Sequence, residues 1–305
     1  MIKIEGVTKV YRKGSPPAVD GLTLDMNDGE VLGLVGLNGA GKTTTIRMSS
    51  GITLPTSGKI LVDGFDIVRE KVRASRNVGW IPEFPNFEPN AKPLTLLKYF
   101  AGFYGLGGRE AEDKALELLR MVGLEKAMDK KLRSYSQGMK KRFSIAETLI
   151  GDPKNVLFDE TLNGLDPQGV IFVRKMIGRL RSEGKAILLS SHILTEIEDS
   201  ADRVAIINRG KLVKLLDRSE LKYLGKTQVK ITVDNPDGPI EGVLSQFGET
   251  ERRGNEFLVR DLKVNSDRIP DILEALVGKG YRVREFTSFG ESLEQYFFDL
   301  IGGSK

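Results

Sequence analysis

The segment GLNGAGKTTT, residues 36–45, constrains the fold of this chain more than any other. Glycines weaken regular secondary structure, so three of them beside a run of β-branched threonines indicate that bare backbone is needed at this point. The apolar run VLGLV (31–35) precedes the segment and predicts a strand that is buried on both faces. The run TTTIRMSSG follows it and predicts a helix that ends near Gly51. We therefore expect the order strand, glycine loop, helix.

The spacing of the glycine loop is that of a phosphate-binding P-loop. Gly36 is followed by four residues and then by Gly41, Lys42 and Thr43. The backbone N–H groups of such a loop bind phosphate oxygens, and the helix N-terminus adds partial positive charge. We expect Lys42 to reach the β- and γ-phosphates and the Thr43 hydroxyl to ligate Mg²⁺. The expected nucleotide-binding residues of the loop are Gly36, Leu37, Asn38, Gly39, Ala40, Gly41, Lys42, Thr43 and Thr44.

A second apolar run, NVLFDE (155–160), ends in two carboxylates. On its own this is a charged strand end that faces solvent, as in many proteins. Because a P-loop lies upstream, we interpret Asp159 as a residue that holds Mg²⁺. Glu160 follows directly and is expected to polarise the water that attacks the γ-phosphate.

The run KAILLSSH predicts a buried strand that ends beside His192, the only histidine of the chain. A lone histidine is most often a structural or surface residue, and one histidine excludes a multi-histidine metal site. Ligands gather at strand ends in open α/β sheets, however. We therefore expect His192 to bond to the γ-phosphate and to orient Glu160 or the attacking water.

The segment RSYSQGMKKR (133–142) has no use inside a simple nucleoside triphosphatase. Ser136 is suited to cap the basic helix that follows it. The Ser136 hydroxyl and the Gly138 N–H at a helix N-terminus also make a second anion site. The residues alone leave both interpretations open.

Composition bounds the class of protein. The chain has 305 residues, of which 40% are hydrophobic and 29% charged, and its net charge is +4. It contains no cysteine, which excludes disulfides, thiolate metal sites and cysteine nucleophiles. No stretch approaches 18 uninterrupted apolar residues, and the N-terminal MIKIEGVTKVY lacks an apolar signal core, so we expect a cytoplasmic protein. The charge is mild and forms no long basic tract, so no nucleic-acid partner is expected.

The chain divides into two regions. Residues 1–220 alternate strand-like and helix-like segments, which is typical of an α/β fold, and a helical subdomain is expected at about 88–150. Residues 221–305 are expected to run strand, helix, two strands, helix, strand and a last helix. That order predicts a small ferredoxin-like α+β domain, with no histidine and no glycine-rich phosphate loop.

Over residues 1 to about 215, the sequence resembles the ATP-binding subunits of ABC transporters. Five motifs carry this resemblance, in the order of the family. GLNGAGKTT (36–44) resembles the Walker A motif, NVLFDE (155–160) Walker B, YSQGM (135–139) the signature loop, LNGLDP (162–167) the D-loop and SSH (190–192) the switch histidine. Tyr11, in KVYRKG, stands where the family stacks an aromatic ring on adenine.

The chain departs from the family pattern in several places. The signature has Gln137 and Met139 where the family has glycine and glutamine, while Ser136 and Gly138 are retained. Thr161 replaces the proline that usually follows the Walker B glutamate.

The loop that usually carries glutamine reads GWIPEFPNFEPN, with Glu83 at the glutamine position. Glutamate can still ligate Mg²⁺ or its water, although an exposed loop acid is the plainer interpretation. This loop, with Pro82 followed by Glu83, and the C-terminal segment SLEQYFFDL both resemble the branch of the family that exports drugs, lipids or polysaccharides.

The resemblance implies an ATPase that works as an ATP-dependent homodimer. Each ATP lies between Walker A of one chain and the signature of the other, where Ser136 and Gly138 contact the γ-phosphate. It also implies a separate transmembrane permease and a peripheral location on the inner face of the cell membrane. Phe84, Phe87 and the segment KPLTLLKYFAGFYG are expected to contact that permease or to form local core.

Two other classes are considered. A soluble ABC-type ATPase of chromosomes, DNA repair or translation would carry a long coiled coil or a second cassette, and this chain carries neither. A sensor that binds nucleotide without turnover is disfavoured by the presence of Glu160 and His192.

Overall fold

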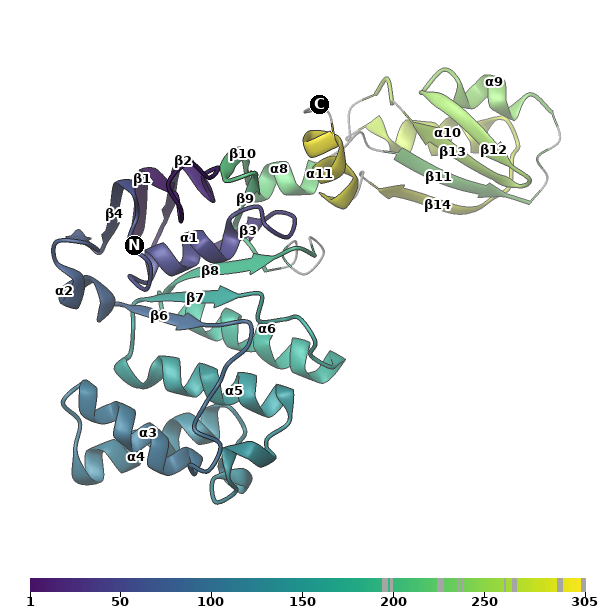
Figure 1. Cartoon of the computed structure of the whole chain (residues 1–305). Coiled ribbons are helices and arrows are strands. Elements are labelled where there is room, and N and C mark those ends of the chain that lie inside the picture. The colour runs from purple at the N-terminus through teal and green to yellow at the C-terminus, as the bar shows by residue number, and fades with distance from the viewer. Residues whose placement is uncertain are drawn as a thin grey trace. The chain divides into compact units, whose positions relative to one another are not determined.

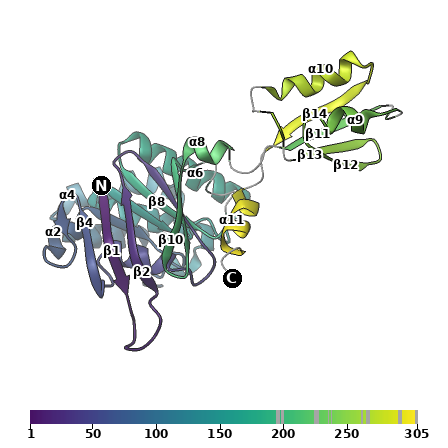
Figure 2. The same ribbon diagram turned by 90° about the horizontal axis from the view of Figure 1, so that it is seen from above.

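A computed structural model describes the chain except for residues 194–196, 198–199, 224–227, 235, 237, 261, 265–267, 290–292 and 303–305. The chain forms two compact units, Met1–Asp217 and Arg218–Lys305 (Figures 1 and 2).

The first unit is built on a six-stranded sheet in the order β10-β9-β3-β8-β7-β6. All neighbouring pairs are parallel except β10 with β9. The strands of this sheet are β3 (Val31–Val35), β6 (Val78–Ile81), β7 (Asn155–Asp159), β8 (Ala186–Ser191), β9 (Arg203–Asn208) and β10 (Lys211–Asp217). All residues of β3, β7 and β8 are buried, as their apolar sequences predict for strands covered on both faces.

A second, antiparallel sheet has the order β2-β1-β4-β5. Its strands are β1 (Ile2–Lys9), β2 (Val19–Met26), β4 (Ser57–Val62) and β5 (Phe65–Asp66). Helix α1 (Lys42–Ser49) lies between this sheet and the six-stranded one (Figure 1).

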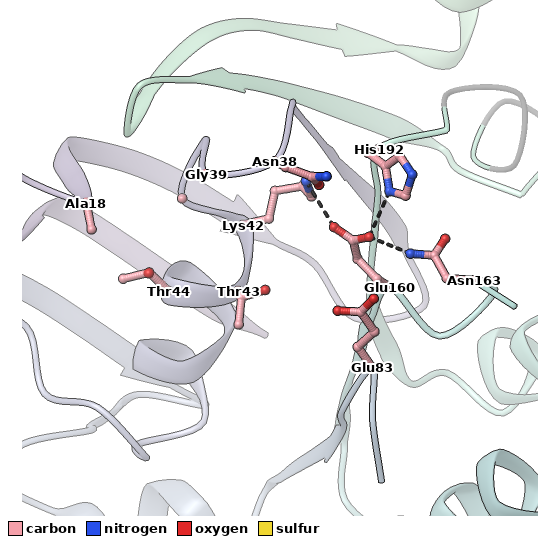
Figure 3. Close-up of a pocket in the computed structure, with 11 residues that line it drawn as sticks. Ala18, Asn38, Gly39, Lys42, Thr43, Thr44, Glu83, Glu160, Asn163 and His192 are labelled. Carbon is pink, nitrogen blue, oxygen red and sulfur yellow. Dashed lines mark hydrogen bonds and ion pairs between the residues drawn. The ribbon is translucent and has the colours of Figure 1, made fainter. Parts of the chain in front are cut away.

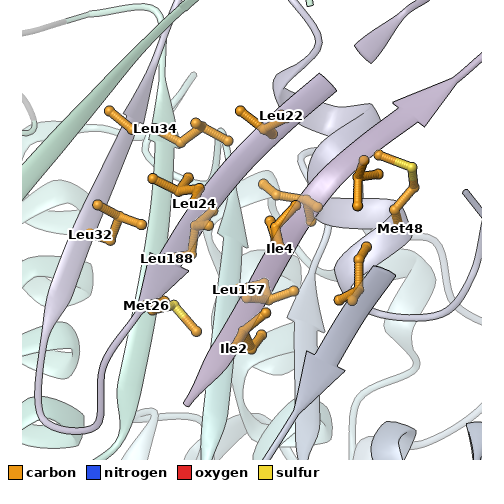
Figure 4. Packing of buried hydrophobic residues seen from close by; sticks show 14 of the residues in the cluster. Ile2, Ile4, Leu22, Leu24, Met26, Leu32, Leu34, Met48, Leu157 and Leu188 are labelled. Atoms are coloured by element: carbon orange, nitrogen blue, oxygen red, sulfur yellow. The ribbon is translucent and has the colours of Figure 1, made fainter. Parts of the chain in front are cut away.

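The core around α1 joins these three elements (Figure 4). Alternate residues of β1 and β2 point inward because successive side chains of a strand face opposite sides. The buried side chains include Ile2, Ile4, Leu22, Leu24, Met26, Leu32, Leu34, Ile46, Met48, Leu157 and Leu188. The packing on both sides of α1 fixes the position of the loop that enters it.

Residues 93–151 form a helical subdomain, in agreement with the segment expected at about 88–150. It contains α3 (Pro93–Phe103), α4 (Gly108–Met121) and α5 (Gln137–Thr148), together with 3₁₀ turns at 125–127, 132–134 and 149–151. The three helices contact one another. Phe87 packs edge-on against the buried Phe143, with ring centroids 4.8 Å apart, so Phe87 belongs to the local core.

Two further helices among the described residues of the first unit are α2 (Lys71–Ser75) and α6 (Pro167–Ser182). The Asp166 carboxylate accepts a hydrogen bond from Gly169 N at 2.8 Å and so caps α6, which packs against β8.

The second unit has the strand order β12-β13-β11-β14 with antiparallel pairing throughout. Its elements are α8 (Arg218–Tyr223), β11 (Gln228–Val233), α9 (Ile240–Leu244), β12 (Glu249–Arg253), β13 (Glu256–Arg260), α10 (Pro270–Gly278), β14 (Val283–Phe289) and α11 (Leu293–Gly302). The predicted β-α-β-β-α-β order and ferredoxin-like arrangement are confirmed.

One face of this small sheet packs against α9 and α10, and the other is charged. Val229, Ile231 and Val233 are buried with the two helices, while Lys230 points to the opposite face and pairs with Glu256 at 3.0 Å. The period-two alternation of β11 produces this division.

A truncated chain that ends at Asp217 should fold and bind ATP. Every residue of the core around α1 precedes position 217, so the phosphate loop keeps its support without the second unit. Thermal unfolding followed by circular dichroism and titration with a fluorescent ATP analogue would check this, with the full chain as reference. A truncated chain that folds but binds no nucleotide would show that the second unit contributes to the site.

Candidate active site

The ends of four parallel strands meet at one edge of the sheet. Val35, the last residue of β3, pairs with Ser191 of β8. Asp159, the last residue of β7, pairs with Ser190 of β8, and β6 ends nearby at Ile81. The loops after these strands therefore converge at the carboxyl edge of the sheet, where open α/β sheets bind ligands.

The loop after β3 depends on its glycines. Gly41 has a φ of +110°, and a Cβ there would lie 2.6 Å from the carbonyl oxygen of Ala18. A Cβ on Gly36 would lie 2.5 Å from the carbonyl oxygen of Ile207. Gly39 has a φ of +83° and faces open space. Two of the glycines thus allow close packing of backbone, and the third leaves backbone exposed to a ligand.

The loop opens on a cavity of about 490 Å³ (Figure 3). Residues from the loops after β3, β6, β7 and β8 line it, so the structure brings together motifs that lie far apart in the sequence. The lining residues are Ala18, Asn38, Gly39, Gly41, Lys42, Thr43, Thr44, Glu83, Glu160, Asn163 and His192.

Lys42 is the cation at the centre of this cavity. It is only 4% exposed. Its Nζ donates hydrogen bonds to the carbonyl oxygens of Gly36 at 2.7 Å and Leu37 at 3.2 Å, and it pairs with Glu160 Oε1 at 3.0 Å. The P-loop carbonyls and a carboxylate thus hold the ammonium beside the exposed loop backbone.

Glu160 is buried and receives three polar contacts (Figure 3). Besides Lys42, the amide of Asn163 donates to Oε2 at 2.6 Å, and His192 Nδ1 lies 2.8 Å from the same oxygen. Burial by itself opposes ionisation, but the Lys42 ammonium and the hydrogen bonds from His192 and Asn163 outweigh it and lower the pKa of Glu160. Glu160 is therefore an ionised carboxylate at neutral pH.

The contact with Glu160 also sets the tautomer of His192. An ionised carboxylate only accepts, so Nδ1 carries the proton in this contact. A neutral His192 then has an unprotonated Nε2. The neutral ring can orient Glu160 through Nδ1–H but cannot donate from Nε2. Only the imidazolium, which carries protons on both nitrogens, can also donate to a phosphate oxygen.

Asp159 lies beneath the P-loop helix. Its Oδ1 accepts hydrogen bonds from Thr43 Oγ1 at 3.1 Å and Ser190 Oγ at 3.0 Å. Burial raises the pKa of Asp159, the nearby charges of Glu160 and Glu83 raise it further, and the two hydrogen bonds only partly compensate. A cation bound here would relieve this excess of negative charge. The hydroxyl and carboxylate oxygens are the hard ligands that Mg²⁺ prefers.

Glu83 follows β6 and lines the cavity, as its position in the sequence predicts. Among the residues that the structure describes, no three or more His, Cys, Asp or Glu side chains form a metal cluster. A metal ion at this edge would therefore need oxygen ligands from Thr43 and from the nucleotide as well.

Tyr11 lies beside the P-loop, outside the cavity. It is 57% exposed, its hydroxyl lies 3.4 Å from Thr44 Oγ1, and Lys9 Nζ is 5.2 Å from the ring centroid. An exposed ring next to the phosphate loop is a suitable platform for a base.

Ser136 and Gly138 lie at the start of α5 and do not line the cavity. Ser136 Oγ accepts a hydrogen bond from Met139 N at 3.2 Å, so its predicted role as helix cap is confirmed. The structure does not bring these two residues to the phosphate loop of their own chain.

Asn163, Ser190 and Ala18 have no role that the sequence predicts, although Asn163 lies within LNGLDP and Ser190 within SSH. The backbone N–H of Asn163 bonds to the carbonyl oxygen of Glu160 at 3.2 Å in a tight turn. A polar residue three positions after Glu160 is a detectable signal, because the first and fourth side chains of a turn can lie close together.

A glycine loop between a buried strand and a helix, facing a lysine, a threonine, two acidic residues and a histidine, defines a P-loop nucleoside triphosphatase.

Comparison with known proteins places the chain within this class. Residues 19–163 match the ABC transporter family. The bacitracin transport ATP-binding protein BcrA of Bacillus licheniformis is 35% identical, over 99% of this chain and 98% of that protein. The Nod factor export ATP-binding protein I of Cupriavidus metallidurans is 33% identical, over 99% and 97%. The structure of cbiO1 from Clostridium perfringens matches with a TM-score of 0.65 and 28% identity, over 72% of this chain and 89% of that one.

The chain therefore belongs to the family of ABC transporter ATP-binding proteins, and the resemblance seen in its motifs is confirmed. Its activity is ATP hydrolysis coupled to transport.

Replacing Gly41 with alanine should abolish tight ATP binding. The new methyl group would collide with the Ala18 carbonyl, and the φ of +110° is unfavourable for any residue with a Cβ. Gly178→Ala in the exposed part of α6, where a Cβ meets open space, is the control and should instead stabilise the fold by up to about 1 kcal/mol. ATP affinity and the unfolding midpoint would be measured for both. Unchanged ATP affinity in Gly41→Ala would contradict the assigned loop geometry.

Proposed function

We propose that the cavity binds Mg²⁺–ATP and hydrolyses it with Glu160 as the general base. The contact network of Glu160 carries this proposal: an ionised carboxylate, oriented by His192 and Asn163, lies beside the P-loop and its lysine. The N–H groups of residues 36–44 bind the phosphates, and Lys42 turns from Glu160 to the β- and γ-phosphates when ATP enters.

In the proposed reaction Glu160 accepts a proton from water while the water oxygen bonds to the γ-phosphorus. The bond from the γ-phosphorus to the bridging oxygen breaks, and ADP and phosphate are released. His192 keeps the carboxylate oriented through Nδ1, and as the imidazolium it donates to the γ-phosphate from Nε2. A positioned base of this kind contributes about 10²–10⁴ to the rate.

Thr43, Asp159 and Glu83 are the residues that we propose to hold Mg²⁺, directly or through water. The negative charge accumulated around Asp159 supports this assignment. When bound, Mg²⁺ neutralises charge that develops on the phosphate oxygens. Tyr11 is proposed to stack on the adenine, because its exposed ring lies next to Thr44.

Glu160→Gln should bind ATP but lose turnover by roughly 10²–10⁴, since the amide cannot accept the proton of water. Lys42→Ala should lose ATP binding, because a charge-assisted phosphate contact disappears. Glu183→Gln, an exposed carboxylate that pairs with Arg179 at 2.9 Å, is the matched control and should keep full turnover. Phosphate release and binding of a fluorescent ATP analogue would be measured. Turnover at the wild-type rate in Glu160→Gln would show that another group is the base.

The position of the signature residues supports a dimer with two shared sites. Ser136 and Gly138 start a helix away from the cavity of their own chain, yet a serine hydroxyl and N–H groups at a helix N-terminus suit a phosphate. We propose that they bind the γ-phosphate held by a second copy of the chain. ATP then joins two chains, and hydrolysis removes the shared phosphate.

Glu160→Gln should accumulate as a dimer with ATP and return to monomer with ADP, because contacts to a charged phosphate are individually strong. Adding Ser136→Arg, which puts bulk at the shared site, should abolish the dimer. Adding Ser182→Arg at the far end of α6 should not. Analytical ultracentrifugation with ATP, ADP and no nucleotide would distinguish these states. A Glu160→Gln protein that stays monomeric at saturating ATP, with or without its permease, would refute the shared sites.

We further propose that the chain drives export through a separate permease and works at the cytoplasmic face of the membrane. Within the described ranges, no helix is long and apolar enough to cross a membrane. Phe84 is 74% exposed, and Tyr99 and Phe103, whose ring centroids lie 5.2 Å apart, are 63% and 66% exposed. Exposed aromatic side chains of this kind are suited to a protein partner. Relatives named for bacitracin transport and Nod factor export support the exporter branch.

A further inference from the structure

Lys141 is a buried lysine that the proposed reaction does not use. It lies in α5, five positions after Ser136, and is only 4% exposed. Its Nζ donates to the carbonyl oxygen of Thr161 at 2.7 Å and also to that of Asn163. Burying an ammonium group is costly unless it is well hydrogen-bonded, so these contacts must be formed in the folded protein.

Both carbonyl groups belong to residues 160–165, the segment that begins with the proposed base Glu160, which we call the carboxylate loop. Asn163 also donates its side-chain amide to Glu160 Oε2 at 2.6 Å. Lys141 therefore fixes the backbone of Asn163, and the side chain of Asn163 fixes the carboxylate of Glu160.

The carboxylate loop needs such support. Glu160 itself has a φ of +44°, a conformation that side chains with a Cβ rarely adopt, and Gly164 has a φ of +67°. A strained backbone persists only where its surroundings fix it. The Glu160 N–H bond to Ser190 Oγ at 3.0 Å fixes one end of the loop, and Lys141 fixes the middle.

We infer that Lys141 is a positioning residue for ATP hydrolysis, which acts on Glu160 through Asn163. Lys141 touches neither nucleotide nor water in this scheme. Lys141 joins α5, which Ser136 caps, to the carboxylate loop, which carries Glu160. A movement of α5 at Ser136 would therefore shift the Glu160 carboxylate of the same chain. This inference rests on the proposed role of Glu160.

The alternative hypothesis, that Lys141 only stabilises the fold, predicts a different result. If Lys141 only stabilised the fold, Lys141→Met would lower the unfolding midpoint, because the carbonyl oxygens of Thr161 and Asn163 lose their buried donor. The kcat of the folded protein would then stay close to that of the wild type. A positioning role predicts that turnover falls while folding and ATP binding persist.

The test measures kcat, the KM for ATP and the unfolding midpoint of the full chain with Lys141→Met. We expect kcat to fall by about 10²-fold, since small displacements of a reacting group have effects of this size. KM should stay within about threefold of the wild type, because the phosphate loop is untouched. If Lys141→Met does not fold, Lys141→Gln, which keeps a donor, takes its place.

Lys185→Met is the matched control. Lys185 is also largely buried, donates to the Pro153 carbonyl oxygen at 2.9 Å and pairs with Asp152, but it precedes β8 at the end away from the site. This variant should keep the kcat of the wild type.

A double-variant cycle tests the route through Asn163. Asn163→Ala should lower kcat by a factor similar to that of Lys141→Met, and the double variant should be no worse than about threefold below the slower single variant. Multiplying effects in the double variant would show that the two residues act separately and would overturn the inference.

The inference is also overturned if Lys141→Met retains the wild-type kcat, or if it and Lys141→Gln both lose ATP binding along with the fold. Glu160→Gln separates this failure from failure of the proposed function. A slow Glu160→Gln with a normal Lys141→Met contradicts only the positioning role. A normal Glu160→Gln contradicts the base on which that role depends.

Discussion

The buried ion pair between Lys42 and Glu160 is the interaction on which the cavity depends. It joins the P-loop after β3 to the carboxylate after β7, although the two residues lie far apart in the chain. The pair lowers the pKa of Glu160, and the ionised carboxylate in turn sets the tautomer of His192 and receives the amide of Asn163. In the proposed function, a phosphate that enters the loop competes with this carboxylate for the Lys42 ammonium, so nucleotide binding would release the proposed base from Lys42.

Much of the fold and half of the site follow from local pattern. The glycine spacing and the apolar runs around Gly36 predict the strand, loop and helix, because close approach of backbone and phosphate leaves few other residues possible. The ends of β7 and β8 could be predicted for a different reason. Parallel strands that are buried on both faces have continuous apolar sequences, so the polar residues that follow mark where each strand ends. The small domain follows from the period-two alternation of strands such as β11.

The remaining part of the site could not be predicted, because it depends on contacts between distant segments. Nothing in SQGMKKR indicates which of its two lysines is buried, and only the packing of α5 directs Lys141 toward Thr161. The contact of Asn163 with Glu160 is different, because it spans only three positions and the polar side chain is a local signal. The positive φ of Glu160, however, has no signature in the sequence. Phe87 is an apolar example of the same limit. The sequence leaves open whether this loop residue contacts a partner or the core, and the structure packs it against Phe143.

Helix α5 has a consequence for the proposed dimer as a whole. Ser136 and Lys141 are separated by five positions of one helix, about 7.5 Å along its axis at 1.5 Å per residue. A rigid element of this length would transmit the arrival of a phosphate in the partner's site to the carboxylate of the chain's own site. The two catalytic centres would then not be independent, and the rate of hydrolysis would rise more steeply than in proportion to ATP concentration.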